Sequence, residues 1–153
     1  MNKKKHQTNH DLSHTDFEVH RIRETYLNSS QQTSGTGIWD WDIVSGDLHW
    51  SDRIWQLLGY DKEITETSYD NFLEAVHPDD RENVIRAVYH CIEHGAAYNI
   101  EHRVIWSDGS VHWVQENGVV IRTKDGSQLR MLGLVSDINA RKCFELALTK
   151  LTK

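Results

Sequence analysis

The feature that most constrains the fold is a run of three strand-like segments in the second half of the chain. They cover residues 98–106, 111–122 and 129–136, and apolar and polar side chains alternate within each of them. Asp108-Gly109 and Asp125-Gly126 separate them, and Asp-Gly between alternating segments is typical of a tight β-hairpin. The sequence therefore predicts three successive antiparallel strands, against which the rest of the chain has to pack.

Two further strands are predicted nearer the N-terminus. Residues 38–43 alternate so that Trp39, Trp41 and Ile43 share one face, and residues 48–50 return after a turn at Ser45-Gly46-Asp47. Five antiparallel strands that have one buried face need a covering layer. The sequence therefore predicts an α+β fold, with one five-stranded antiparallel sheet and helices on one of its faces.

The covering helices are expected between the second and third strands. A short helix over residues 53–58 ends at Gly59, and another begins at Ser68. A longer helix begins at His77-Pro78, because proline at the first helical position loses no hydrogen bond, and it ends at Gly95. Its predicted buried side chains are Val84, Ile85, Val88 and Ile92.

The two ends of the chain differ from this central region. Residues 1–11 are polar and are expected to be disordered, and residues 12–34 are predicted to form an amphipathic helix followed by a linker. The domain is expected over residues 35–138, and a linker helix over residues 139–153. An apolar stripe on this last helix predicts a partner helix: Phe144, Ala147, Leu148 and Leu151. A homodimer through the Leu12–Tyr26 helix and the C-terminal helix is therefore expected.

Composition excludes several classes of protein. A formal net charge of −6 argues against a nucleic-acid partner, because such surfaces are usually basic. Nothing in the chain approaches the run of about 18 apolar residues that spans a membrane, and a cytoplasmic location is expected. The cysteines, Cys91 and Cys143, lie on separate predicted helices, so reduced thiols are expected.

Five stretches of the chain, in order, match the motifs of a known family. They are GIWDWDIVSGDLHWSD, IWQLLGY, AVHPDDR, EHRVIWSDGSVHWV and LGLVSDINARK. Together they resemble the PAS domain with its C-terminal PAC motif, over about residues 37–142. The resemblance implies the strand order 2-1-5-4-3 and a non-enzymatic sensory or dimerising module. By family habit, such a module relays a change to an output domain, either a histidine kinase or a GGDEF-type diguanylate cyclase.

By similarity to ligand-binding PAS domains, the inner face of the sheet forms the pocket. Alternation groups the residues within each strand, but only the resemblance says which face is inside. The implied candidates are Trp39, Trp41, Ile100, His102, Val104, Val114, Glu116, Met131, Gly133 and Val135, with Val84 and Val88 on the long helix. Asp137, Ile138 and Asn139 would then pass a shift of the last strand into the C-terminal helix. The alternative is a dimerisation scaffold in which the same residues form a solid core without a ligand.

His102 and Glu116 are the polar members of this predicted inner face. A carboxylate among apolar side chains costs several kcal/mol unless it is paired, so an inward Glu116 needs a donor. His102 on the neighbouring strand is the expected donor, which would give either a contact for a ligand or a satisfied core pair. In the alternative interpretation, Glu116 faces solvent beyond a bend in the strand.

No cofactor is assigned from the sequence. The flavin-binding PAS domains carry an Asn-Cys-Arg motif and a glutamine on the last strand, where this chain has Val135, so flavin is not expected. Haem is not expected either, because Val84 occupies the position of the haem-binding histidine. His90, Glu93 and His94 match the H-x-x-E-H zinc pattern, but a third ligand is not evident. Neither a metal site nor catalytic residues are therefore predicted, although adventitious metal at His90 and His94 stays open.

Overall fold

The computed structural model describes residues 35–63, 65–126 and 129–151. Its sheet consists of β1 (Thr36–Asp42), β2 (Leu48–Trp50), β3 (Tyr98–Ile105), β4 (Val111–Arg122) and β5 (Leu129–Asp137). The strands run in the order β2-β1-β5-β4-β3, and every neighbouring pair is antiparallel. The predicted fold class and strand order are both confirmed.

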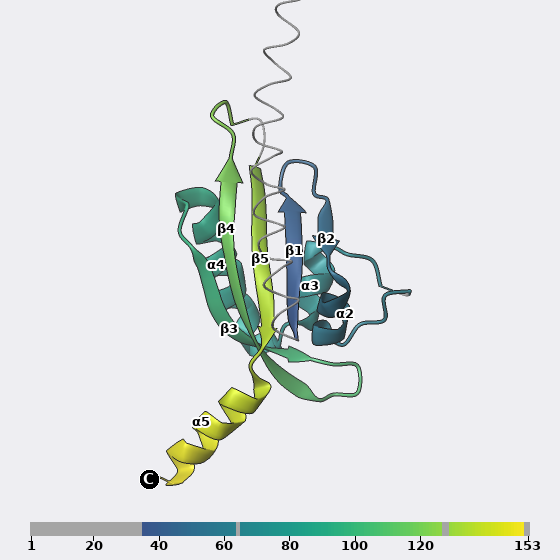
Figure 1. The fold of residues 1–153 in the computed structure, drawn as a ribbon, viewed down its shortest axis with the longest axis vertical. Coiled ribbons are helices and arrows are strands. Elements are labelled where there is room, and N and C mark those ends of the chain that lie inside the picture. Colours follow the sequence, from purple (N-terminus) through teal and green to yellow (C-terminus); the bar gives the residue numbers. More distant parts are fainter. Residues whose placement is uncertain (1–34, 64, 127–128, 152–153) are drawn as a thin grey trace, which may run out of the picture.

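Among the described residues, three helices separate β2 from β3, and another follows β5 (Figure 1). They are α2 (Asp52–Leu58), α3 (Tyr69–Ala75), α4 (Pro78–His94) and α5 (Asn139–Leu151). The first three cover the inner face of the sheet, whereas α5 projects away from it and buries none of its side chains. The segments predicted over residues 1–11 and 12–34, including the Leu12–Tyr26 helix, lie outside the described residues.

The helix ends follow the local signals in the sequence. The Ser68 hydroxyl accepts a hydrogen bond of 2.9 Å from the amide of Asn71, as an N-cap does. Pro78 stands at the start of α4, where the His77 ring accepts from the amide of Asp79. Gly59 and Gly95 end α2 and α4 in the left-handed conformation, with φ of 74° and 68°.

One predicted core position on α4 is wrong. Ile85 is 47% exposed, whereas Val84, Val88 and Cys91 are buried and Ile92 is half-buried. Residues 84, 88 and 91 follow the i, i+4, i+7 spacing of one helix face, and residue 85 is rotated by about 100° from residue 84. Residue type alone predicts that Ile85 is buried, but this position lies outside the packed face of the helix.

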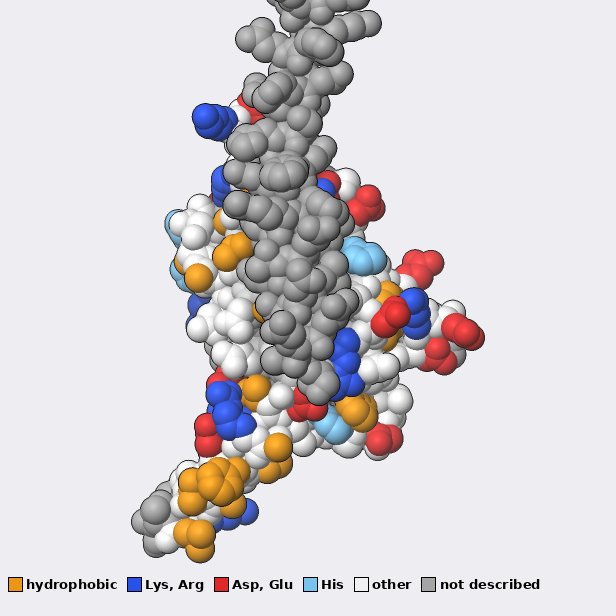
Figure 2. Space-filling view, viewed as in Figure 1, with side chains coloured by type: hydrophobic (Ala, Val, Ile, Leu, Met, Phe, Trp, Pro, Cys, Tyr) orange, Lys and Arg blue, Asp and Glu red, His pale blue; other side chains and the backbone are white. Residues whose placement is uncertain are grey.

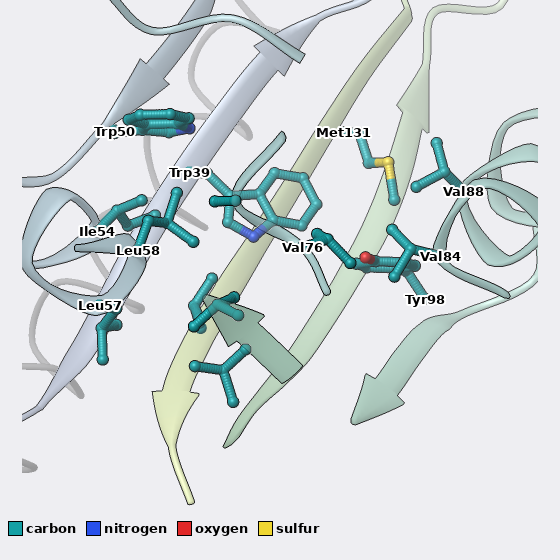
Figure 3. Close-up of a cluster of buried hydrophobic side chains, with 14 of the residues drawn as sticks. Trp39, Trp50, Ile54, Leu57, Leu58, Val76, Val84, Val88, Tyr98 and Met131 are labelled. Carbon is teal, nitrogen blue, oxygen red and sulfur yellow. The ribbon is translucent and has the colours of Figure 1, made fainter. Parts of the chain in front are cut away.

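The centre of the core is an indole that lies across two glycines. In the register of the sheet, Gly118 of β4 faces Gly133 of β5, and Gly133 faces Trp39 of β1. A Cβ added to Gly118 would lie 2.8 Å from Cη2 of Trp39, and one added to Gly133 would overlap the same ring. The indole therefore occupies the space on the inner face that side chains at Gly118 and Gly133 would otherwise fill (Figure 3).

We predict that Gly133→Ala lowers the free energy of unfolding by about 1–3 kcal/mol, because the new methyl group overpacks the site of the Trp39 ring. Urea denaturation measures this change. In a Trp39→Val background the same substitution should cost clearly less, since the clashing ring is gone. Equal costs in both backgrounds would mean that the ring does not explain the glycine.

Candidate functional site

A small cavity lies between the inner face of the sheet and the helices. Its volume is about 40 Å³. It is lined by Trp39, Trp41, Leu48, Trp50, Ile54, Leu58, Tyr69, Phe72, Val88, Tyr98, Glu116, Met131 and Val135. Residues of the sheet and of α2, α3 and α4 all line the cavity, so a change in its shape would alter contacts in most elements of the domain.

The predicted pocket residues divide into two groups. Six of them line the cavity: Trp39, Trp41, Val88, Glu116, Met131 and Val135. The other six surround it as part of the core or the inner face: Val84, Ile100, His102, Val104, Val114 and Gly133. Gly133 has no side chain to line the cavity, and its missing Cβ leaves room for the Trp39 ring.

Seven lining residues were not among the predicted candidates. They are Leu48, Trp50, Ile54, Leu58, Tyr69, Phe72 and Tyr98. The alternation of β3 places Tyr98 on the same face as His102, so the existing pattern could have found it. The contribution of α2 and α3 depends on how these short helices close over the sheet, which the sequence pattern does not specify.

A buried hydrogen-bonded cluster joins β3 to β4 beside the cavity. Nε2 of His102 lies 2.6 Å from Oε2 of Glu116, and the Tyr98 hydroxyl donates to the same oxygen over 2.8 Å. The side chains of His102 and Glu116 are 1% and 3% exposed. The predicted pairing of these two residues is confirmed, and the solvent-facing interpretation of Glu116 is wrong because β4 keeps its alternation through this position.

The cluster changes the titration of its members. Burial, followed by the charge of Glu116, raises the pKa of Tyr98 well above its ordinary value, so its hydroxyl remains a donor. Burial by itself would lower the pKa of His102, but the hydrogen bond and the charge of Glu116 outweigh burial and raise the pKa. The folded protein therefore holds a proton on His102 more tightly than an exposed histidine does.

The size of the cavity limits what it can hold in this conformation. Pockets for drug-sized ligands occupy about 300–1,000 Å³, and a haem or a flavin would not fit this volume unless Trp39 moved. The Nε1 of Trp39 is buried without a hydrogen-bond partner among the described residues. Such an unsatisfied donor costs about 1–3 kcal/mol.

The predicted relay residues dock α5 onto the end of the sheet. The amide of Ile138 donates to the Trp113 carbonyl over 3.1 Å, and the Trp113 amide donates to Oδ1 of Asn139 over 3.2 Å. The amide of Asn139 in turn donates to Oδ1 of Asp137 over 2.8 Å. β4 therefore holds the point at which β5 becomes α5.

Charged side chains reinforce this junction. The Lys142 ammonium lies 4.9 Å from the centre of the Trp113 ring and 2.6 Å from a carboxylate oxygen of Glu101. The Arg103 guanidinium lies 5.5 Å from the same ring and pairs with Asp80 of α4 over 2.8 Å. Contacts therefore run from α4 through β3 and β4 to the first turn of α5.

The histidine pair on α4 forms a separate surface feature. The ring centres of His90 and His94 are 5.6 Å apart, and both side chains are exposed. Among the described residues, no group of three or more potential metal-ligating side chains comes together. The Cys91 between them is buried and cannot join the pair at the surface.

The fold is that of a known family. A sequence model of the PAS fold matches residues 47–135, more than half of the chain. The chain therefore belongs to the PAS fold family. It is a sensory module of the kind that signalling proteins contain, and such modules are typically not catalytic.

Sequence relatives and solved structures agree with this family. The sensor protein FixL of Bradyrhizobium diazoefficiens is 34% identical over 114 residues, which cover 74% of this chain and 22% of FixL. The probable diguanylate cyclase DgcE of Escherichia coli is 24% identical over 122 residues, 80% of this chain and 11% of that protein. The chain thus spans less than a quarter of the length of these curated relatives.

Among solved structures, the chain is similar to a sensory box histidine kinase/response regulator from Burkholderia thailandensis, with a TM-score of 0.70 and 28% identity. The match covers 82% of this chain and 94% of that one. The N-terminal domain of a diguanylate cyclase from Marinobacter aquaeolei gives a TM-score of 0.63 at 21% identity, covering 70% and 98%, and shows the fold alone. Within the described part of the chain, no helix has the length and hydrophobicity to span a membrane.

We predict that the free energy of unfolding falls as the pH rises from about 6 to about 8, in part because of His102. Its pKa is raised in the folded state, so the stabilisation is fully present below its unfolded pKa of about 6.5 and is lost as the pH rises through the folded pKa. Urea denaturation across this range should show a flatter profile for His102→Gln. The exposed His49→Gln variant is the control and should keep the decline.

Proposed function

We propose that this chain is the sensory input of a larger signalling protein, in which a change at the inner cavity reaches an output domain through α5. The observation that carries the proposal is the double role of β5. Met131 and Val135 of this strand line the cavity, and two residues after Val135 the chain reaches the Asp137–Asn139 junction. A shift of β5 at the cavity would therefore reach α5 directly.

The output domain is proposed from the relatives. One is a sensor protein and another a probable diguanylate cyclase, and the chain covers only a small part of each. We infer an output of the histidine kinase or diguanylate cyclase kind beyond α5. The chain itself has a binding role and no catalytic one, and a cytoplasmic location remains the prediction of the sequence.

We predict that Val135→Phe alters α5, because a larger side chain in the small cavity displaces β5. A spin label on the exposed Cys143 of α5 reports this change, since Cys91 is buried. Val119→Phe is the control, because Val119 is exposed on the outer face of β4 away from the junction, and it should leave the label unchanged. An identical spectrum for Val135→Phe and wild type, with the variant folded, would contradict the relay.

Dimerisation through α5 is the second part of the proposal. Three members of the predicted stripe are exposed, with Phe144, Leu148 and Leu151 at 65%, 45% and 82%. Figure 2 shows apolar side chains gathered along this helix. An apolar face that the described residues leave exposed at Phe144 and Leu151 favours a second copy of the chain as its partner.

We predict a dimer at high micromolar concentration that Phe144→Glu weakens by at least about tenfold, because a carboxylate would enter an apolar contact. Sedimentation equilibrium measures the dissociation constant. Leu146→Glu is the matched control, since Leu146 is also exposed but lies on the opposite side of the helix from the stripe. A monomeric wild type, or equal weakening by both variants, would contradict dimerisation through this face.

The second candidate function is a dimerisation scaffold without a ligand. It is favoured by the small size of the cavity and by the Trp39 ring that fills the sheet between Gly118 and Gly133. Absorbance spectra and native mass spectrometry of the purified protein separate the two candidates. A bound small molecule would exclude the scaffold.

A further inference from the structure

The carboxylate of Glu116 is only half satisfied. Both of its hydrogen bonds end on Oε2, one from Tyr98 and one from His102. Oε1 accepts none from any described residue, and Glu116 lines the cavity. A buried carboxylate is stable when its remaining lone pairs meet donors or a positive charge. A ligand that brings an N–H donor to the cavity would supply both.

The walls of the cavity suit a cation. Six of the lining residues are aromatic: Trp39, Trp41, Trp50, Tyr69, Phe72 and Tyr98. The face of an aromatic ring attracts a cation, and several rings around one acidic group are a known way to hold a methylated ammonium ion. Among the described residues that line the cavity, Glu116 is the only charged one. The cavity therefore favours a positive ligand over a negative one.

The volume sets the size of that ligand. A water-sized group needs about 10–15 Å³ of such space, so a cavity of about 40 Å³ takes about three non-hydrogen atoms. Methylammonium and dimethylammonium have two and three, and their methyl groups match the apolar walls. Larger ammonium ions would require displacement of Trp39 or of α3.

We propose that the cavity binds a small alkylammonium ion of the size of methylammonium or dimethylammonium, held by Glu116 and the surrounding aromatic rings. The inference rests on the proposed sensory function, because the ion would be the signal that the module detects. Its N–H groups would donate to Oε1 of Glu116, and its methyl groups would contact the rings.

Binding of this ion competes with the proton on His102. A single buried carboxylate compensates one positive charge, so the ion binds best when His102 is neutral and donates only its Nε2–H. Other titratable groups act on this pair from the packed elements: Tyr98 of β3, Tyr69 of α3 and Asp80 of α4, while Cys91 of α4 acts on Tyr98. Since the pKa of His102 is raised, binding should release a proton and strengthen as the pH rises.

Thermal denaturation with millimolar dimethylammonium chloride tests the proposal. Against equal potassium chloride, the melting temperature of the wild type should rise, and it should rise more at about pH 8 than at about pH 6. Glu116→Gln keeps the shape of the side chain without its charge and should weaken binding by at least about tenfold. Trp41→Leu removes a half-buried ring and should weaken it by a few fold, which provides a second test if Glu116→Gln does not fold.

Three results would overturn the proposal. The first is no stabilisation of the wild type by either methylammonium or dimethylammonium. The second is equal stabilisation by methanol or ethanol, which are neutral molecules with the same two and three non-hydrogen atoms. The third is unchanged affinity in both Glu116→Gln and Trp41→Leu.

The test is separate from that of the proposed function. If the ion binds but the label on Cys143 of α5 does not respond, the ligand class stands and the relay is wrong. If no ion binds but Val135→Phe still alters α5, the relay stands and the ligand class is wrong.

Discussion

The packing of the Trp39 indole over Gly118 and Gly133 determines how the two halves of the sheet and the helices meet. The ring originates on β1, lies over β5 and β4, and makes a T-shaped contact with Tyr98 on β3, with 5.9 Å between the ring centres. One side chain thus bridges strands that are far apart in sequence. The close approach is possible because both positions lack a Cβ. The cavity is the space that remains around this ring, and its small size follows from the same packing.

The second organising interaction is the buried pair of His102 and Glu116. It adds little to the hydrophobic core, and breaking such a pair usually costs more than the pair contributes, because one buried charge is left behind. Here it places a carboxylate and a histidine on an otherwise apolar inner face. The strand that flanks it, β5, continues into the junction with α5, where Trp113 and Asn139 hold the helix start. The pair and the start of α5 are thus separated by one strand.

Much of the architecture was accessible from local patterns. Alternation in β3, β4 and β5 grouped the candidates within each strand, and the resemblance indicated which group faces inward. The turn and cap signals gave the limits of most elements to within about two residues. Ile85 was the exception on α4, because residue type alone does not define which helix face is packed. Trp50, Tyr69 and Phe72 were missed as cavity-lining residues for a related reason. They come from a short strand and a short helix, whose positions are set by long-range contacts.

The strand order came from the resemblance. By itself, the sequence determined the class of fold, the grouping of residues on each strand face and the point at which β5 becomes α5. These properties depend on periodicity and capping, which act over a few neighbouring residues. Only the tertiary structure decided the shape and size of the cavity, the half-satisfied carboxylate within it and the contact of Lys142 with Trp113. Those depend on distances between side chains that are far apart in the chain, because a cavity is defined by what surrounds it from several elements at once.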